Sequence, residues 1–261
     1  MSMQRGNFKM NKPADEKKQT PVLAVCGKGG VGKTVFSALL ARVWMESGVA
    51  PILLIDADPV GGLTSAIGED AVRTLAGVRD QFIRTARLGV KTELAKAAGQ
   101  LDYLVLQALV EHDRYSLLAM GHNLEKGCFC PANDLLRSAI GALVPAFAGV
   151  LIDAEAGIEQ INRDVTQRVT QVVVVVDASQ RSLDTLLIIS KMILPSRIAV
   201  VANRVSAAVK LHLPEGVTLL GRIPENEELR QFDREGRPLW SLPPENEALE
   251  AVRKIAGALA R

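Results

Sequence analysis

One short segment, residues 27–34, constrains the fold more than any other feature of the chain. It reads GKGGVGKT, satisfies the pattern Gly-x4-Gly-Lys-Ser/Thr, and lies between an expected strand, Val22–Cys26, and an expected helix over residues 34–47. A glycine-rich loop in this context can direct backbone N–H groups at phosphate oxygens, helped by the positive end of the helix. The sequence therefore predicts a phosphate-binding loop at the carboxyl end of a buried strand.

The residue types of this loop suit a nucleoside triphosphate with Mg²⁺. Glycine accepts backbone conformations and close approaches that a Cβ would prevent. Lys33 is expected to neutralise charge on the β- and γ-phosphates, and the Thr34 hydroxyl to hold Mg²⁺. A glycine-rich turn without a ligand is the alternative. The residues expected to cradle the phosphates through their backbone are Gly27, Gly29, Gly30, Val31 and Gly32.

The rest of the chain alternates short apolar runs with helix-period segments, which is typical of a parallel sheet covered on both faces. We expect a single α/β domain over residues 21–261, with a doubly wound, mostly parallel sheet and helices on both faces. Residues 1–20 are interpreted as a disordered extension. Residues 77–100 are expected to hold helices with an irregular connection. Further strands are predicted at 52–55, 103–106, 149–152, 172–176, 198–202 and 217–220, and further helices at 182–192 and 245–260.

Composition and charge exclude several classes of protein. Hydrophobic residues make up 48% and charged residues 23% of the chain, as in ordinary globular domains. With three cysteines and no apolar leader, we expect reduced thiols and a cytoplasmic location. Residues 1–20 carry a net charge of +3, which leaves the remainder at −1 and argues against a nucleic-acid partner. The longest uncharged stretch, 138–152, is too short to span a membrane and is interrupted by glycine and proline.

Acidic residues follow two of the expected strands. Asp56 and Asp58 come after the run 52–55, and Asp153 comes after 149–152. Because ligands bind beyond the carboxyl ends of strands in doubly wound sheets, these carboxylates are expected at the same edge as the phosphate loop. A helix cap or a solvated loop charge is the alternative for each one.

Two cysteines, Cys128 and Cys130, flank a single phenylalanine. In an extended backbone, residues i and i+2 point the same way, so both thiolates can face one metal ion. One chain supplies two thiolates, and a two-fold axis through the site would supply four. On spacing alone, free loop thiols fit equally well. His122 is a weaker candidate for a secondary ligand and is more simply a loop histidine.

The remaining histidines and the third cysteine are assigned no metal role. His112 and His212 are not expected to bind metal. Cys26, in the first strand, is expected to be a buried core residue.

The early lysine of the loop, Lys28, is not required by the general pattern. A loop reading KGGVGKT resembles the deviant P-loop of the superfamily of dimeric ATPases that includes partition, division-site and nitrogenase iron proteins. The resemblance implies that Lys28 reaches the nucleotide of a partner subunit and that Asp58 positions or activates the attacking water. It also implies that Asp153 is associated with Mg²⁺ and that Gly157 senses the γ-phosphate.

The same resemblance implies a site for the base. Asn203, in the triplet Ala-Asn-Arg, matches the asparagine that contacts adenine in the superfamily, and an ordinary turn asparagine is the alternative. Arg222 and Pro224, in the triplet Arg-Ile-Pro, resemble the second loop that flanks the purine.

Over about residues 22–240, the chain resembles the CooC-type nickel-insertion ATPases that mature carbon monoxide dehydrogenase. The resemblance lies in four segments that occur in this order: KGGVGKT, DADP, GCFCP and DAEAGIE. The resemblance implies a homodimer controlled by ATP, with Ni²⁺ or Zn²⁺ held between subunits by Cys128 and Cys130. It also implies a client that is carbon monoxide dehydrogenase or a related Ni–Fe–S enzyme. The chain departs from the family at Gly62, where an asparagine usually precedes the leucine that is here Leu63.

Two other functions remain open. Four thiolates per dimer could instead hold an iron–sulfur cluster that bridges two subunits of an electron-donating ATPase. A partition or positioning ATPase would need no metal, but would need a basic surface or a membrane-targeting helix. The segment 245–260 places Leu249, Val252, Ile255 and Leu259 on one stripe, which favours a helix docked on the core.

Overall fold

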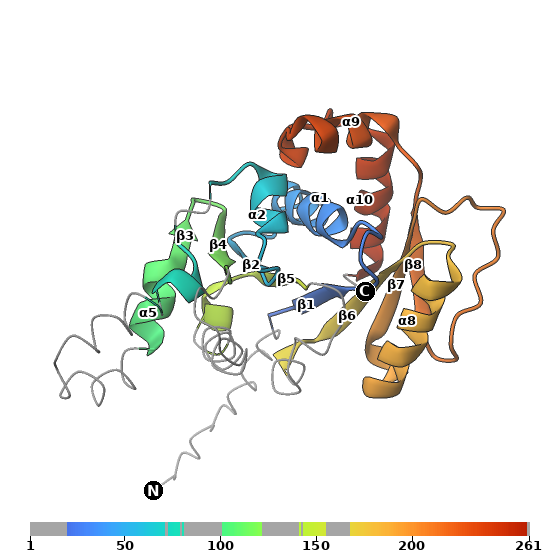
Figure 1. Ribbon diagram of the computed structural model, residues 1–261, viewed down its shortest axis with the longest axis horizontal. Helices are drawn as coiled ribbons and strands as arrows, with labels where there is room; N and C mark the ends of the chain where they lie inside the picture. Colours follow the sequence, from blue (N-terminus) through green and yellow to red (C-terminus); the bar gives the residue numbers. More distant parts are fainter. Residues whose placement is uncertain are drawn as a thin grey trace, which may run out of the picture.

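The computed structural model describes residues 20–70, 73–78, 80, 101–121, 141, 143–154 and 168–259. Within these residues the chain forms an eight-stranded sheet in the order β3-β4-β2-β5-β1-β6-β7-β8, in which only β3 and β4 are antiparallel (Figure 1). The predicted class, a single, mostly parallel α/β domain, is confirmed. The strands are β1 Val22–Cys26, β2 Ile52–Asp56, β3 Leu109–Glu111, β4 Tyr115–Ala119, β5 Gly149–Asp153, β6 Gln171–Val176, β7 Ile198–Asn203 and β8 Thr218–Ile223. The helices are α1 Lys33–Glu46, α2 Gly62–Ile67, α5 Leu101–Ala108, α8 Gln180–Met192, α9 Glu227–Glu235 and α10 Glu247–Leu259.

Both faces of the sheet are buried. Along β1 the side chains alternate: Ala24 and Cys26 belong to one apolar cluster, and Leu23 and Val25 belong to the other. Helices α1, α2 and α10 contribute to the cluster around Leu23, and α5 and α8 contribute to the opposite one (Figure 1). The near-continuous apolar strands seen in the sequence therefore reflect burial on two faces.

The topology gathers the functional segments at one edge. Strand β1 lies between β5 and β6, and all three run parallel. The chain leaves β1 through the glycine-rich loop and enters α1, and later strands are added on both sides of β1. A crevice forms at this kind of reversal of strand order, outside the carboxyl ends of the strands.

One predicted strand is wrong. Residues 103–106 lie within helix α5, and Val105 and Ala108 are buried while Leu106 is exposed. Spacing of three residues between buried positions is helical, and a short apolar run cannot by itself distinguish a strand from a buried helix. Strands β3 and β4 were not predicted. Strand β4 pairs with β2 on one side and with β3, the edge strand, on the other.

The C-terminal helix is docked on the core, as predicted. The side chains of Leu249, Val252 and Ile255 are buried against α1 and β8. The helix begins at Glu247 rather than at residue 245, because the Asn246 side chain accepts hydrogen bonds from the first free backbone N–H groups. Across the described ranges, no helix combines the length and apolar character needed to cross a bilayer.

Candidate nucleotide-binding site

The glycine-rich loop requires glycine at two positions. Gly27 has φ 140°, and a Cβ there would lie 2.3 Å from the carbonyl oxygen of Val175. Gly32 has φ 91°, and a Cβ there would lie 2.2 Å from Nδ2 of Asn203. Both positions therefore combine a left-handed backbone with a close approach, which a larger residue could not accept. The loop is pressed against β6 at one end and β7 at the other.

Donors of the loop point into its interior. The Val31 N–H and the Lys33 ammonium both approach the carbonyl oxygen of Lys28, at 3.4 Å and 3.3 Å. Two donors that converge on one oxygen can also converge on a phosphate oxygen of similar size and greater charge. Helix α1 begins at Lys33, so its positive end faces the same space.

Asp153 links the end of β5 to the first turn of α1. Its two carboxylate oxygens accept hydrogen bonds from the hydroxyls of Thr34 and Ser37, each at 2.8 Å, and the residue is 2% exposed. Burial raises the pKa of Asp153 to about 6. The hydroxyl bonds and the Lys33 charge oppose this rise, and the neighbouring Asp56 adds to it. Asp153 is the last residue of the strand, not the first residue after it.

These oxygens fit a magnesium ion. A threonine hydroxyl and an aspartate carboxylate are hard oxygen donors, which Mg²⁺ prefers. Ser37 was not predicted as part of this group. It lies three residues after Thr34, so both side chains occupy one face of α1, and that spacing is the signal that could have found it.

Asp56 anchors the segment that follows β2. It is fully buried at the end of β2, and one oxygen accepts bonds from the N–H and hydroxyl of Thr64, at 2.8 and 2.7 Å. Burial raises the pKa of Asp56, although the bonds from Thr64 oppose the shift. Like Asp153, it is the last strand residue, and the two stand side by side in register. Asp56 therefore holds α2 rather than facing open space.

Asp58 lies closer to the phosphate loop. It is partly buried, and its Oδ1 accepts a bond from the N–H of Val60 at 2.9 Å. A Cβ on Gly62 would lie 3.5 Å from Oγ1 of Thr34 and 3.8 Å from Oδ2 of Asp58. The structure thus brings Asp58, Gly62 and Thr34 together, which suits the role predicted for Asp58 beside the terminal phosphate.

The other flank of the loop is held by β7. Asn203, at the end of that strand, donates from Nδ2 to the carbonyl oxygen of Val31 at 2.7 Å. The next residue, Arg204, donates to the carbonyl oxygen of Gly30 at 2.6 Å. The Asn203 amide nitrogen thus contacts the loop, and its contact with adenine remains a prediction. Arg204 was not predicted, although it completes the triplet Ala-Asn-Arg.

Lys28 is partly exposed and lies near Asp177, the residue that follows β6. Partial burial alone would raise the pKa of Asp177, but hydrogen bonds from Ser179 and the Lys28 charge hold it below its usual value. Asp177 was missed, and the strand-end argument used for Asp56 and Asp153 would have found it. The predicted contact of Lys28 with a partner subunit remains a prediction.

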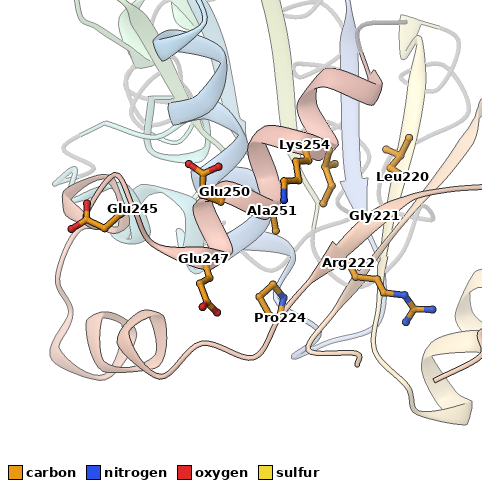
Figure 2. A pocket seen from close by; sticks show the side chains of 10 residues that line it. Leu220, Gly221, Arg222, Pro224, Glu245, Glu247, Glu250, Ala251 and Lys254 are labelled. Carbon is orange, nitrogen blue, oxygen red and sulfur yellow. The ribbon is translucent and has the colours of Figure 1, made fainter. Parts of the chain in front are cut away.

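Arg222 and Pro224 border two cavities. One cavity, of about 370 Å³, lies between them and residues 204–207 after β7. The Arg222 guanidinium donates there to the carbonyl oxygens of Ser206 and Val209, at 3.0 and 2.8 Å. The other cavity, of about 530 Å³, lies between β8 and α10, and Figure 2 shows the Arg222 side chain pointing away from α10. The 370 Å³ cavity is the better placed for a base, because Arg204 joins it to the phosphate loop.

Several predicted residues lie outside the described part of the chain: Cys128, Cys130, His122 and Gly157. Within the part that is described, no cluster of three or more His, Cys, Asp or Glu side chains is arranged to bind a metal.

The other histidines and the third cysteine lie in the described part. His112 contacts Glu69 at 3.1 Å and stacks on Tyr115, and His212 is exposed. Cys26 is buried, as predicted, and burial raises its thiol pKa to about 12.

The chain belongs to the CbiA family, described as the CobQ/CobB/MinD/ParA nucleotide binding domain, which matches residues 22–239. The chain is an ATPase of this family. Solved structures agree on the fold. The cell division ATPase MinD of Pyrococcus furiosus superposes with a TM-score of 0.64 at 22% identity, over 92% of this chain and 98% of that one. A ParA family ATPase of Chlorobium tepidum superposes with a TM-score of 0.66 at 18% identity, again over 92% of this chain and 98% of that one.

Two relatives are more similar in sequence. An uncharacterized ATP-binding protein of Methanocaldococcus jannaschii is 36% identical over 248 residues, which cover 90% of this chain and 96% of the relative. The carbon monoxide dehydrogenase accessory protein CooC of Rhodospirillum rubrum is 32% identical over 239 residues, which cover 85% of this chain and 90% of the relative.

Proposed function

We propose that this ATPase is a metallochaperone that dimerises around ATP and holds Ni²⁺ or Zn²⁺ between subunits, in support of nickel insertion into carbon monoxide dehydrogenase. The observation that carries the proposal is its 32% identity to the CooC accessory protein over 85% of this chain and 90% of the relative. The Cys128-Phe129-Cys130 segment supports it, because paired thiolates suit a soft or borderline metal ion as cargo.

Hydrolysis in this proposal depends on position and charge rather than on a covalent intermediate. The N–H groups of the loop and the Lys33 ammonium bind the phosphates and neutralise their charge. Asp58 orients the attacking water, and Lys28 reaches the nucleotide of the partner subunit. Thr34 and Asp153 would hold Mg²⁺, which when bound neutralises phosphate charge. Gly157 is assigned to sensing the γ-phosphate, and Asn203, Arg222 and Pro224 to binding the base.

The proposal is tested by size-exclusion chromatography with metal analysis of the full chain, run without nucleotide, with ADP and with a non-hydrolysable ATP analogue. We expect a dimer that carries about one Ni²⁺ or Zn²⁺. The double variant Cys128→Ser with Cys130→Ser should lose tight metal binding but keep ATP hydrolysis. Its one remaining cysteine, Cys26, is buried in the core and cannot replace the pair.

Matched controls separate the metal from the nucleotide. Lys33→Ala should lose hydrolysis and keep the thiols, and His122→Ala should keep metal at full stoichiometry. Metal retained by the double cysteine variant would reject the thiolate site. A brown, iron-containing protein purified without oxygen would instead favour an electron-donating ATPase with a bridging cluster. A nucleotide-dependent dimer that binds no metal would favour a positioning ATPase.

A further inference from the structure

Arg204 has an uncommon backbone conformation directly beside the phosphate loop. Its φ is 58°, and no other non-glycine residue in the described ranges has a positive φ. Its N–H donates to the carbonyl oxygen of Ile223 at 2.9 Å, which ties the turn after β7 to the end of β8. The turn brings the Arg204 guanidinium back over the loop, where it donates to Gly30.

The conformation indicates that the side chain matters. A left-handed backbone costs free energy for any residue with a Cβ, and glycine would adopt it without that cost. Strain of this kind persists where the surrounding structure needs the side chain. Here the side chain is a long cation that ends on a carbonyl oxygen of the phosphate loop.

The contact acts on the orientation of peptide groups. Arg204 and Asn203 hold two consecutive carbonyl oxygens, those of Gly30 and Val31. Since the C=O and N–H of a trans peptide point in opposite directions, these contacts turn the N–H groups of Val31 and Gly32 away from β7. The Val31 N–H does point inward, toward the carbonyl oxygen of Lys28.

We propose that Arg204 is a positioning residue for nucleotide phosphates: by holding the Gly30 carbonyl it aims backbone donors of the loop before the ligand arrives. The inference rests on the nucleotide role of this loop. Arg204 touches the loop rather than the phosphates, so its effect is on preorganisation and is equal in the ground state and the transition state.

Arg204 also lines the 370 Å³ cavity with Arg222 and Pro224, so a direct contact with a base must be distinguished from an action through the loop. Inorganic tripolyphosphate makes this distinction, because it has the phosphates of ATP and no base. An action through the loop changes the affinity for both ligands by the same factor.

The test compares Arg204→Gly and Arg204→Lys with Arg234→Ala, which removes an exposed arginine on α9 that pairs with Glu227. For Arg204→Gly we expect a KM for ATP about five- to tenfold higher, with kcat within about twofold, in line with the loss of one solvent-exposed hydrogen bond. The dissociation constants of ATP and tripolyphosphate should rise by that same factor. Arg204→Lys should recover most of the loss, because its ammonium can donate one bond, and Arg234→Ala should match the wild type.

The stability of Arg204→Gly makes the result specific. Because the relief of backbone strain offsets the lost hydrogen bond to Gly30, its free energy of unfolding should change by less than about 1 kcal/mol, so weaker binding cannot be attributed to poor folding. A wild-type KM in Arg204→Gly would overturn the inference. A higher dissociation constant for ATP with an unchanged one for tripolyphosphate would also overturn it, because Arg204 would then contact the base. If the wild type bound neither ATP nor tripolyphosphate, the nucleotide role of the loop would fail together with the inference.

Discussion

The two flanks of the phosphate loop are built from different chemistry. On the β5 flank, a buried carboxylate, Asp153, receives the hydroxyls of Thr34 and Ser37. On the β7 flank, the Asn203 amide and the Arg204 guanidinium hold carbonyl oxygens of the loop. The first flank presents oxygen ligands and carries a group whose charge changes near neutral pH. The second supplies only donors, and the groups that they hold do not titrate.

The difference suggests a division of work. The β5 flank supplies the ligands for a cation, since a buried carboxylate beside hydroxyls suits a divalent ion. The β7 flank sets the shape of the loop, since it acts on peptide groups. Changes on the β5 flank should therefore depend on pH and on Mg²⁺, and changes on the β7 flank should depend on neither.

Gly32→Ala should have the largest effect. The new Cβ would meet Nδ2 of Asn203 at 2.2 Å, at a φ of 91° that alanine rarely adopts. We expect a loss of about 3–4 kcal/mol in the free energy of unfolding, equal at pH 6 and pH 8, and measured by urea denaturation. Gly29→Ala is the matched control, because nothing lies within 4 Å of its Cβ and its φ is ordinary. Equal stability losses in the two variants would remove the close approach as the cause.

Asp153→Asn should have an intermediate effect that depends on pH. Because the folded-state pKa of about 6 lies above the ordinary aspartate pKa of 3.8, the folded chain binds the proton more tightly than the unfolded chain. This contribution to stability is fully present below about pH 4 and is lost as the pH rises through about 6. The variant, uncharged throughout, should be about 3 kcal/mol more stable than the wild type at pH 8. Its slope should be smaller than that of the wild type, and the raised pKa of Asp56 accounts for the slope that remains.

The Asp153 measurement is made in a chelator and without nucleotide, so that the charge of a bound ion does not contribute. Asp233→Asn, which changes an exposed carboxylate on α9, should leave the pH profile of unfolding unchanged. A variant of Asp153 that keeps the wild-type slope between pH 4 and pH 6 would show that another group causes it.

Ser37→Ala should have the smallest effect. It removes one of the two hydroxyl donors to Asp153, and we expect a loss of about 1 kcal/mol in the free energy of unfolding at pH 8. At pH 5 the loss should be smaller, because a protonated carboxyl depends less on donors. Ser190→Ala, which removes an exposed hydroxyl that donates to the Leu187 carbonyl, should change stability by less than about 0.5 kcal/mol. A pH-independent loss in Ser37→Ala would contradict the division between the flanks.

Sequence patterns found the parts of this site that local chemistry defines. The loop could be predicted because its glycines and Lys33 occupy consecutive positions between a strand and a helix. Asp56 and Asp153 could be predicted because parallel strands end at one edge. The patterns failed for α5, where the burial of Val105 and Ala108 selects a helix, and for Ser37 and Arg204, whose partners are distant in the chain.

The amino-acid sequence by itself determined the class of fold and the presence of a phosphate loop, because both follow from short-range order: alternating strands and helices, and glycines that permit close backbone approach. Only the tertiary structure decided what each side chain does at the loop. Asp56 and Asp153 look alike in the sequence, yet one binds Thr64 and holds α2 while the other binds Thr34 and Ser37. Thr64 is only eight positions from Asp56, whereas Thr34 and Ser37 are more than a hundred positions from Asp153 and meet it only when the sheet assembles.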